Sequence, residues 1–382
     1  MNGLWILSMA VHAYVALRLL PGVAAAAGMP WALALALLLL VSALLVPGAL
    51  RRPRARRSAA QQRRDDRLAW LSLGLMGLFS SLFVLTLARD AIELLLWGAA
   101  ALGAPALPAT WAAAAAAGVV LLALAVTLLG LWNARRPARV KQVDVALADL
   151  PPALQGFRIA QISDLHVGPT IKGPYLQRIV DAVNALEVDM VAVTGDLVDG
   201  SVAELGAHVA PLAGLRSRHG SFFVTGNHEY YSGAPQWIAE LRRLGVRVLM
   251  NEHVVLMHQR APLVLAGVAD FSAHQFEPDH RSDPHLALAG APRAAVKVLL
   301  AHQPRSARAA ADAGFHLQLS GHTHGGQFLP WNFFVRFQQP FTAGLHRLGE
   351  MLVYTSRGTG YWGPPKRFGA PSEITHLRLV AA

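Results

Sequence analysis

Residues that can bind divalent metal ions follow five apolar strands predicted in the C-terminal part of the sequence. They are Asp164 and His166 in SDLHVG, Asp196 in TGDLVD, Asn227 and His228 in TGNHE, His302 in LLAHQP, and His322 and His324 in SGHTHGG. Histidine nitrogen and carboxylate oxygen suit Mn²⁺, Fe or Zn²⁺, and a set without cysteine disfavours a structural zinc site. Any single Asp-x-His or His-x-His is usually a turn or a satisfied surface pair. Five such segments in one domain point instead to a metal site.

Short buried strands alternate with helices from Val143 onward, which indicates an α/β domain. Strands are expected at Phe157–Ser163, Met190–Thr194, Ser221–Thr225, Val296–Ala301 and His316–Ser320, and helices at Tyr175–Leu186, Pro235–Leu244 and Pro304–Ala313. Open α/β sheets place their sites at the carboxyl ends of strands, which is where the candidates lie. Gly195, Gly226 and Gly321 each directly precede a candidate, where the chain must turn sharply and bring its backbone close to the site.

The order of these motifs, D-x-H, G-D-x-x-D, G-N-H-E, H and G-H-T-H, resembles the calcineurin-like metallophosphoesterases from Phe157 to about Val380. Further segments are similar to the membrane-associated bacterial branch of that family: HGGQ at 324–327, SRGTG at 356–360, PPKRF, PSEI, and Asp270 in GVAD. The resemblance implies a four-layer αββα sandwich, with two mixed sheets inside and helices outside. It also implies metal-dependent hydrolysis of a phosphodiester or pyrophosphate bond.

The resemblance further implies a role for each candidate. One ion would be bound by Asp164, His166 and His324, and the other by Asn227, His302 and His322. Asp196 would bridge the two ions, and His228 would act beside the phosphoryl group as an acid or charge stabiliser. The two divalent ions are expected to be Mn²⁺, with Fe, Zn²⁺ or Mg²⁺ as alternatives.

This chemistry accounts for the residue types. Two divalent ions about 3.5–4 Å apart can bind phosphoryl oxygens and hold a hydroxide in line with the leaving group. An imidazolium at His228 can stabilise developing charge or protonate the departing oxygen. Asp199 and Glu229 are candidates to orient ligand histidines, with solvated loop acids as an equal alternative.

Substrate contacts are expected in the last part of the chain. Three basic residues in Gly/Pro-rich loops, Arg357, Lys366 and Arg367, are candidates to hold an anionic substrate, with surface charge pairs as an equal alternative. The stretch Phe328–Phe341 (FLPWNFFVRFQQPF) is rich in aromatic residues. It could rest on a bilayer surface or grip an acyl chain, but a packed core loop is the slightly favoured interpretation.

The N-terminal third is apolar and basic. The runs Trp31–Leu50, Leu68–Ala88 and Thr110–Trp132 carry no charge and reach the roughly 20 residues that a membrane span needs. Gly3–Leu20 is a shorter fourth span, and Ala91–Leu107 reads as an interfacial or re-entrant helix. Of the 34 Lys+Arg, 14 lie in residues 1–141 against 4 Asp+Glu, so the basic excess belongs to loops beside spans and does not indicate nucleic-acid binding.

These observations predict a transmembrane helical region at 1–141 and a metallophosphoesterase domain at 142–382. The basic loops Arg51–Arg67 and Arg135–Lys141 should stay cytoplasmic, which places the catalytic domain on that side of a bacterial inner membrane. Expected partners are the membrane and a phosphoester. The resemblance makes a lipid-linked substrate such as UDP-diacylglucosamine a named candidate, and a soluble nucleotide or an envelope polymer is the alternative. No nucleic acid or obligate protein partner is expected.

The alternative function is a membrane transporter or sensor whose phosphoesterase-like domain only binds a ligand. The complete set of ligand residues disfavours it, and so does the lack of internal acids and bases in the spans. The chain also has no cysteine, which excludes disulfides and thiolate nucleophiles.

Overall fold

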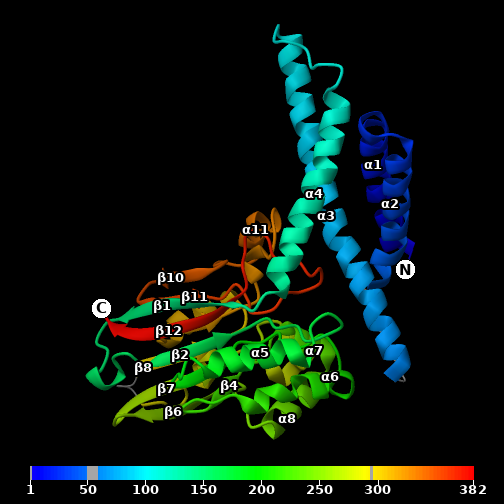
Figure 1. Cartoon of the computed structure of the whole chain (residues 1–382). Coiled ribbons are helices and arrows are strands. Elements are labelled where there is room, and N and C mark those ends of the chain that lie inside the picture. Colours follow the sequence, from blue (N-terminus) through cyan, green and yellow to red (C-terminus); the bar gives the residue numbers. More distant parts are fainter. Residues whose placement is uncertain (1, 50–58, 293–295) are drawn as a thin grey trace. The chain divides into compact units, whose positions relative to one another are not determined.

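A computed structural model describes residues 2–49, 59–292 and 296–382 (Figure 1). The chain divides into two compact units. Met1–Trp132 with Gly363–Lys366 forms a helical unit, and Asn133–Trp362 with Arg367–Ala382 forms an α/β unit.

The helical unit contains four helices that are long and apolar enough to cross a membrane. They are α1 (Asn2–Ala27), α2 (Met29–Ala49), α3 (Ala59–Ala101) and α4 (Trp111–Arg135). The prediction of about four apolar helices is therefore confirmed. Part of the basic loop Arg51–Arg67 lies outside the described residues, and its last nine residues belong to α3.

The structure contains no separate interfacial or re-entrant helix at Ala91–Leu107, so that prediction is wrong in treating this segment as its own element. Helix α3 continues through residue 91 to Ala101, and a turn then leads to α4. No proline or glycine lies between Ala88 and Trp97 to end the helix. At about 1.5 Å per residue, its 43 residues extend roughly 65 Å, about twice the hydrocarbon thickness of a bilayer.

Charged residues of α1 and α3 pair with one another inside the helical unit. Arg18 of α1 lies 2.8 Å from Asp90 and 3.1 Å from Glu93 of α3, and Arg89 lies 2.9 Å from Glu93. Trp111 of α4 donates its indole N–H to Glu93 at 3.1 Å. These contacts correct the expectation that the spans lack internal acids and bases. The two arginines and two carboxylates form a set with no net charge.

The α/β unit is built from twelve strands among its described residues. They are β1 (Arg139–Leu147), β2 (Arg158–Ile162), β3 (Met190–Val193), β4 (Ser221–Phe223), β5 (Arg247–Val248), β6 (Glu252–His258), β7 (Ala261–Gly267), β8 (Val296–Leu300), β9 (Leu317–Ser320), β10 (Gly344–Leu348), β11 (Met351–Thr355) and β12 (Glu373–Ala381). One six-stranded sheet has the order β1-β12-β2-β3-β4-β5, and the other β10-β11-β9-β8-β7-β6. Both sheets are mixed, because β12 is antiparallel to β2, and β6 and β10 are antiparallel to β7 and β11.

Helices connect the strands. The α-helices are α5 (Gly173–Asn184), α6 (Val202–Val209), α7 (Asn227–Ser232), α8 (Ala234–Arg243), α9 (Pro284–Ala287), α10 (Ala307–Ala313) and α11 (Trp331–Phe334). The 3₁₀ turns are η1 (Pro152–Leu154), η2 (Ala210–Gly214), η3 (Ala273–Gln275), η4 (Pro278–His280), η5 (Pro304–Ser306), η6 (His324–Gly326) and η7 (Val335–Phe337). The five strands and three helices expected from the sequence are all present, with ends shifted by one or two residues and with η5 preceding α10.

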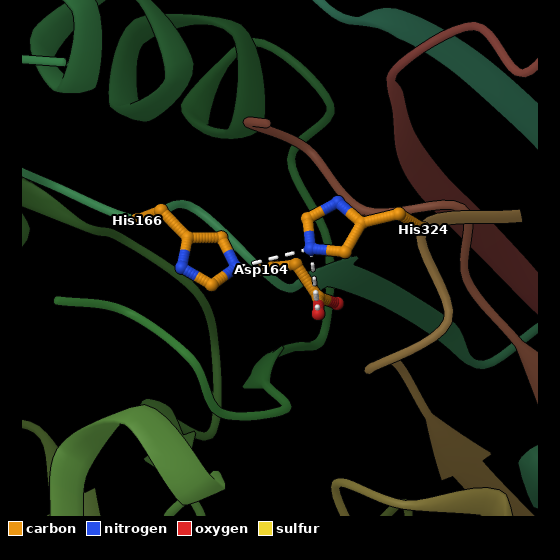
Figure 2. A group of neighbouring side chains, drawn as sticks. All are labelled: Asp164, His166 and His324. Carbon is orange, nitrogen blue, oxygen red and sulfur yellow. Dashed lines mark hydrogen bonds and ion pairs between the residues drawn. The ribbon is translucent and has the colours of Figure 1, made fainter. Parts of the chain in front are cut away.

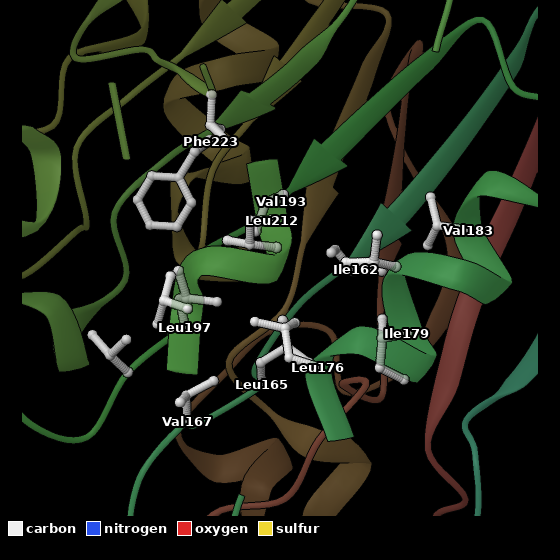
Figure 3. Packing of buried hydrophobic residues seen from close by; sticks show 14 of the residues in the cluster. Ile162, Leu165, Val167, Leu176, Ile179, Val183, Val193, Leu197, Leu212 and Phe223 are labelled. Atoms are coloured by element: carbon white, nitrogen blue, oxygen red, sulfur yellow. The ribbon is translucent and has the colours of Figure 1, made fainter. Parts of the chain in front are cut away.

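Alternating side chains place one apolar core between the sheets and others under the helices. In β3, Met190 and Ala192 face the core shared with the second sheet, whereas Val191 and Val193 face the helices. Figure 3 shows Val193 and Phe223 packed with residues of the same cluster. Burying each such Val or Phe side chain contributes about 1.5–3 kcal/mol.

Helix α5 illustrates how the outer layer forms. Its buried residues Leu176, Ile179, Val180 and Val183 recur at helical spacing, so they make one apolar stripe that packs against the first sheet. Helices α9 and α10 supply buried alanines to a separate cluster on the outer face of the second sheet. The helix–sheet–sheet–helix arrangement confirms the expected four-layer fold.

Candidate metal centre

Three side chains from two sheets converge at the carboxyl ends of β2 and β9. Asp164, His166 and His324 each offer a ligand atom, and these atoms lie within 4.8 Å of one another. The Nε2 atoms of His166 and His324 are 3.0 Å apart, and His324 Nε2 is 3.5 Å from Asp164 Oδ1 (Figure 2). All three residues are buried, so these donors face each other rather than solvent.

A second group adjoins the first through Asp196, which follows β3. Asp196, His302 and His322 form one set with ligand atoms within 4.8 Å, and Asp196 also belongs to a set with His166 and His228. Asp196 Oδ2 lies 3.1 Å from His302 Nε2 and 3.9 Å from His166 Nε2. Asp196 is thus the carboxylate that stands between the two groups.

Strained backbone holds these side chains in place. Asp164, His166 and Asp196 have φ angles of 54°, 53° and 52°, and His322 and His324 have 71° and 51°. Non-glycine residues seldom adopt this left-handed conformation, and such strain concentrates at functional sites. The fold therefore maintains an unfavourable backbone at five of the candidate positions.

Two glycines allow the loops to approach this closely. A Cβ at Gly226 would lie 2.2 Å from Asp196 Oδ1, and one at Gly321 would lie 2.0 Å from Ser163 Oγ and 2.2 Å from Asp164 Oδ2. No other residue fits without displacing the candidate carboxylates. The expectation that these glycines bring backbone close to the site is confirmed.

Asn227 supplies an observation that favours a metal ion. Its Oδ1 atom is buried and has no hydrogen-bond partner among the described residues. A buried carbonyl oxygen left unpaired costs free energy, about 1–3 kcal/mol. A divalent cation is a natural partner for such an oxygen, so the residues present fit a bound metal.

Two histidines are oriented in the way that metal ligands usually are. His302 donates its Nδ1–H to the Thr194 carbonyl oxygen at 2.7 Å, and His166 Nδ1 lies 3.3 Å from Asp199 Oδ1. Each contact leaves Nε2 facing the centre, as in metalloproteins whose ligand histidines donate their other N–H to an oxygen.

His228 lies at the edge of the cluster with two carboxylates beside it. Its Nδ1 is 2.5 Å from Asp199 Oδ1, and its Nε2 is 4.0 Å from Asp196 Oδ2. Burial alone would lower the pKa of His228, but Asp196 and Asp199 outweigh burial and raise the pKa to about 9. Burial opposes ionisation of Asp199 as well, yet His166 and His228 lower its pKa below the usual range. The metal-free site therefore favours an imidazolium paired with carboxylates.

Glu229 does not orient a histidine. It is fully buried and accepts the backbone N–H groups of Asp196, Leu197 and Gly226 at 3.0, 2.8 and 2.6 Å. Burial and the nearby Asp196 raise its pKa to about 8. Its role is to join the loops after β3 and β4, and neither of the two sequence-based interpretations anticipated this.

Arg367 is buried, and every N–H of its guanidinium group has a partner within the protein. It donates to the carbonyl oxygens of His324, Arg357 and Gly360, and its Nη2 lies 3.0 Å from His324 Nδ1. This geometry leaves no donor for a substrate and instead orients the His324 ring with Nε2 toward Asp164. Arg357 remains partly exposed.

Aromatic side chains beside His228 were not anticipated from the sequence. The rings of Tyr231 and Trp362 lie edge-on to His228 at 5.2 and 5.8 Å. Gln327 holds Trp362 by accepting its backbone N–H and donating to its carbonyl oxygen, both at 2.8 Å. Gln327, the last residue of the HGGQ segment, is the only sequence feature that could have indicated this contact. Asp270 is buried and accepts hydrogen bonds from Gln303 and Ser272.

Comparison with known proteins gives consistent matches to one family. A family model described as calcineurin-like phosphoesterase matches residues 157–326. A transmembrane protein with metallophosphoesterase domain from Danio rerio is 39% identical over 274 residues, which cover 69% of this chain and 63% of that protein. An uncharacterized metallophosphoesterase from Campylobacter jejuni is 34% identical over 267 residues, which cover 68% of each chain. Another from Aquifex aeolicus is 32% identical over 243 residues, 63% of this chain and 91% of that protein.

These matches differ in extent. The chain spans about three-fifths of the length of the first vertebrate relatives that it matches, 63% and 62%. It covers nearly the whole of the Aquifex protein. The residues matched by the family model, 157–326, lie within the α/β unit.

Proposed function

Because the chain belongs to the calcineurin-like phosphoesterase family, we propose that it is a membrane-anchored phosphoesterase that uses two divalent cations. The four apolar helices would hold it in the membrane, and the α/β unit would carry out hydrolysis. The observation that carries the proposal is the position of Asp196 between two groups of donors. Together these donors come from both sheets. The unpaired oxygen of Asn227 supports it.

Each cation would have its own residues. Asp164, His166 and His324 would hold one, and Asn227, His302 and His322 the other. Asp196 would contact both, because a carboxylate offers two oxygens. Bound there, divalent ions supply Lewis-acid polarisation of the phosphoryl oxygens. Mn²⁺ is the ion we propose first, since the set of nitrogen and oxygen donors suits it.

His228 would assist departure of the leaving group. Its Nδ1 is occupied by Asp199 at 2.5 Å, so Nε2 is the nitrogen that can give a proton to a departing oxygen. In the metal-free protein the raised pKa keeps this proton on the ring at neutral pH. The hydrogen bond to Asp199 also fixes the direction in which Nε2 points.

The substrate that we propose is a phosphodiester or pyrophosphate, with a lipid-linked molecule such as UDP-diacylglucosamine as the named candidate. A membrane anchor keeps the site near lipids, which favours this class over soluble nucleotides. We also propose a bacterial inner membrane with the α/β unit facing the cytoplasm, because the basic residues near the spans should stay on that side.

Hydrolysis of bis-p-nitrophenyl phosphate with Mn²⁺ tests the mechanism. Asp196→Ala and His228→Ala should each lower kcat/KM by at least about 100-fold. Asp279→Ala and His285→Ala are matched controls, because both residues are exposed and lie outside the cluster. Metal content measured on the same samples should fall for Asp196→Ala and persist for His228→Ala. Full activity in both site variants would refute the mechanism. A metal-loaded wild type that hydrolyses neither this diester nor lipid-linked pyrophosphates would favour the binding-only alternative.

A further inference from the structure

Five large apolar side chains stand exposed on the segment that follows the last histidine motif. Leu329, Trp331, Phe333 and Phe334 are 43%, 49%, 52% and 52% exposed, and Phe337 is 79% exposed. We call these five residues the aromatic patch. Soluble surfaces seldom gather so many large apolar side chains within nine residues, and such patches usually mark an interaction site. The slightly favoured expectation of a packed core loop is therefore not met.

The backbone under the patch is held firmly. Trp331 N–H donates to the Phe328 carbonyl oxygen at 3.0 Å, and Phe333 N–H donates to that of Pro330 at 2.9 Å. Arg305 donates twice to the Gln338 carbonyl oxygen, at 2.9 and 2.7 Å. The aromatic side chains therefore project from a fixed support.

The charge around the patch indicates what covers it. The Arg336 guanidinium lies over the rings of Phe333 and Phe337, 5.8 and 5.9 Å from their centroids. From Phe328 to Gly349 the sequence contains Arg336 and Arg347 but no Asp or Glu. Aromatic rings with interspersed arginine and no acid are typical of surfaces that lie at the headgroup level of a membrane.

We propose that the aromatic patch docks into the headgroup layer of the same bilayer that holds helices α1–α4. The chain itself supplies the reason that a lipid surface, rather than a protein, is the occupant. Spans in the same chain keep the α/β unit near lipid at high effective concentration, so that even a weakly binding patch is engaged. A stable protein interface would need roughly 1,000 Å² or more of matched surface, whereas a lipid surface adapts to five projecting side chains.

Docking would act on the candidate metal centre through a direct backbone contact. A Cβ at Gly326 would lie 2.1 Å from Asn332 Cα, so helix α11 packs against the turn that carries His324 with no side chain between them. The patch thus holds that turn beside the lipid headgroups. Given the proposed function, this position selects phosphoesters that reside in the bilayer.

The absence of cysteine makes a direct test possible. Phe337→Cys introduces a single labelling site at the most exposed position of the patch, and Met257→Cys is the matched control, 57% exposed on edge strand β6. Each full-length variant is labelled with an environment-sensitive fluorophore and placed, one copy per disc, in nanodiscs of phosphatidylcholine and phosphatidylglycerol. Spin-labelled lipid is then added as a quencher. Quenching at position 337 should exceed that at 257 by at least about twofold.

Three results would overturn the proposal: no quenching at 337, equal quenching at both positions, or a blue-shifted probe at 337 that depends on protein concentration in detergent. The last would mean that the patch joins two copies of the chain. Hydrolysis is measured on the same discs as a separate readout. An active chain with an unquenched probe at 337 overturns membrane docking and leaves the proposed phosphoesterase function standing. A quenched probe on an inactive chain supports docking and counts against that function.

Discussion

Asp199→Asn isolates the electrostatic effect of one carboxylate on His228. The wild-type contact is 2.5 Å between His228 Nδ1 and Asp199 Oδ1. An asparagine oxygen can still accept the Nδ1–H, so the ring keeps its orientation while the negative charge is removed. A hydrogen bond to a charged group contributes about 1.5–3 kcal/mol, and one pKa unit corresponds to about 1.4 kcal/mol. The pKa of His228 should therefore fall by about one to two units.

The direction of the effect on activity follows from the proposed role of His228. If the imidazolium donates the proton, kcat/KM declines as pH rises through the His228 pKa, which is about 9 in the metal-free protein. Bound cations add positive charge and lower that value in both proteins, so the predicted quantity is the difference between variant and wild type. The alkaline limb for Asp199→Asn should lie about one to two pH units lower.

The assay is the pH profile of kcat/KM for bis-p-nitrophenyl phosphate at saturating Mn²⁺. Metal content is measured in parallel, because Asp199 also contacts His166 at 3.3 Å. Asp279→Asn, an exposed acid outside the cluster, should reproduce the wild-type profile. An unmoved alkaline limb in Asp199→Asn, at unchanged metal content, would refute the assignment of His228 as the proton donor.

Three further outcomes follow from other parts of the site. Asn227→Ala removes the buried oxygen that has no partner, so the affinity for metal should fall by about 10-fold or more. Titration calorimetry with Mn²⁺ measures this affinity, and an unchanged value would contradict the prediction. Gly321→Ala forces a Cβ to within 2.0 Å of Ser163 Oγ and should lower Tm by about 2–10 °C, whereas Gly74→Ala, with nothing within 4 Å, should not. In the metal-free chain the raised pKa values of His228 and Glu229 stabilise the fold most below about pH 6.5 and pH 4.5. That stabilisation is lost as pH rises through about 9 and 8, so Tm should fall over this range and recover with Mn²⁺.

Much of the fold was predictable because hydrophobic periodicity marks buried strands and helices. The run MVAVT predicts β3, whose four residues are all buried. The spacing of Leu176, Ile179 and Val183 predicts α5. Strand β1 was missed because its first residues include two basic ones, Arg139, which is exposed, and Lys141, which is half-buried. It pairs in parallel with β12, more than 200 residues away, and no local pattern encodes such a partner.

The candidate site was predictable in its residue types but not in its supporting contacts. Aspartate and histidine after each strand were visible as motifs. Arg367 looked like a substrate contact, because sequence shows a cation in a loop but not that its five N–H groups have partners inside the fold. Glu229 likewise could not be placed, since its partners are backbone amides of another loop.

The paired charges of the helical unit have a consequence for how the chain is made. Arg18 emerges from the ribosome about seventy residues before Asp90 and Glu93, the only carboxylates in the described part of the chain with which it forms an ion pair. Until those residues are synthesised, α1 must keep its guanidinium near water or polar headgroups. Helix α1 can therefore take up its final position in the membrane only after the C-terminal part of α3 has been synthesised. We therefore expect the insertion of α1 to depend on the synthesis of α3.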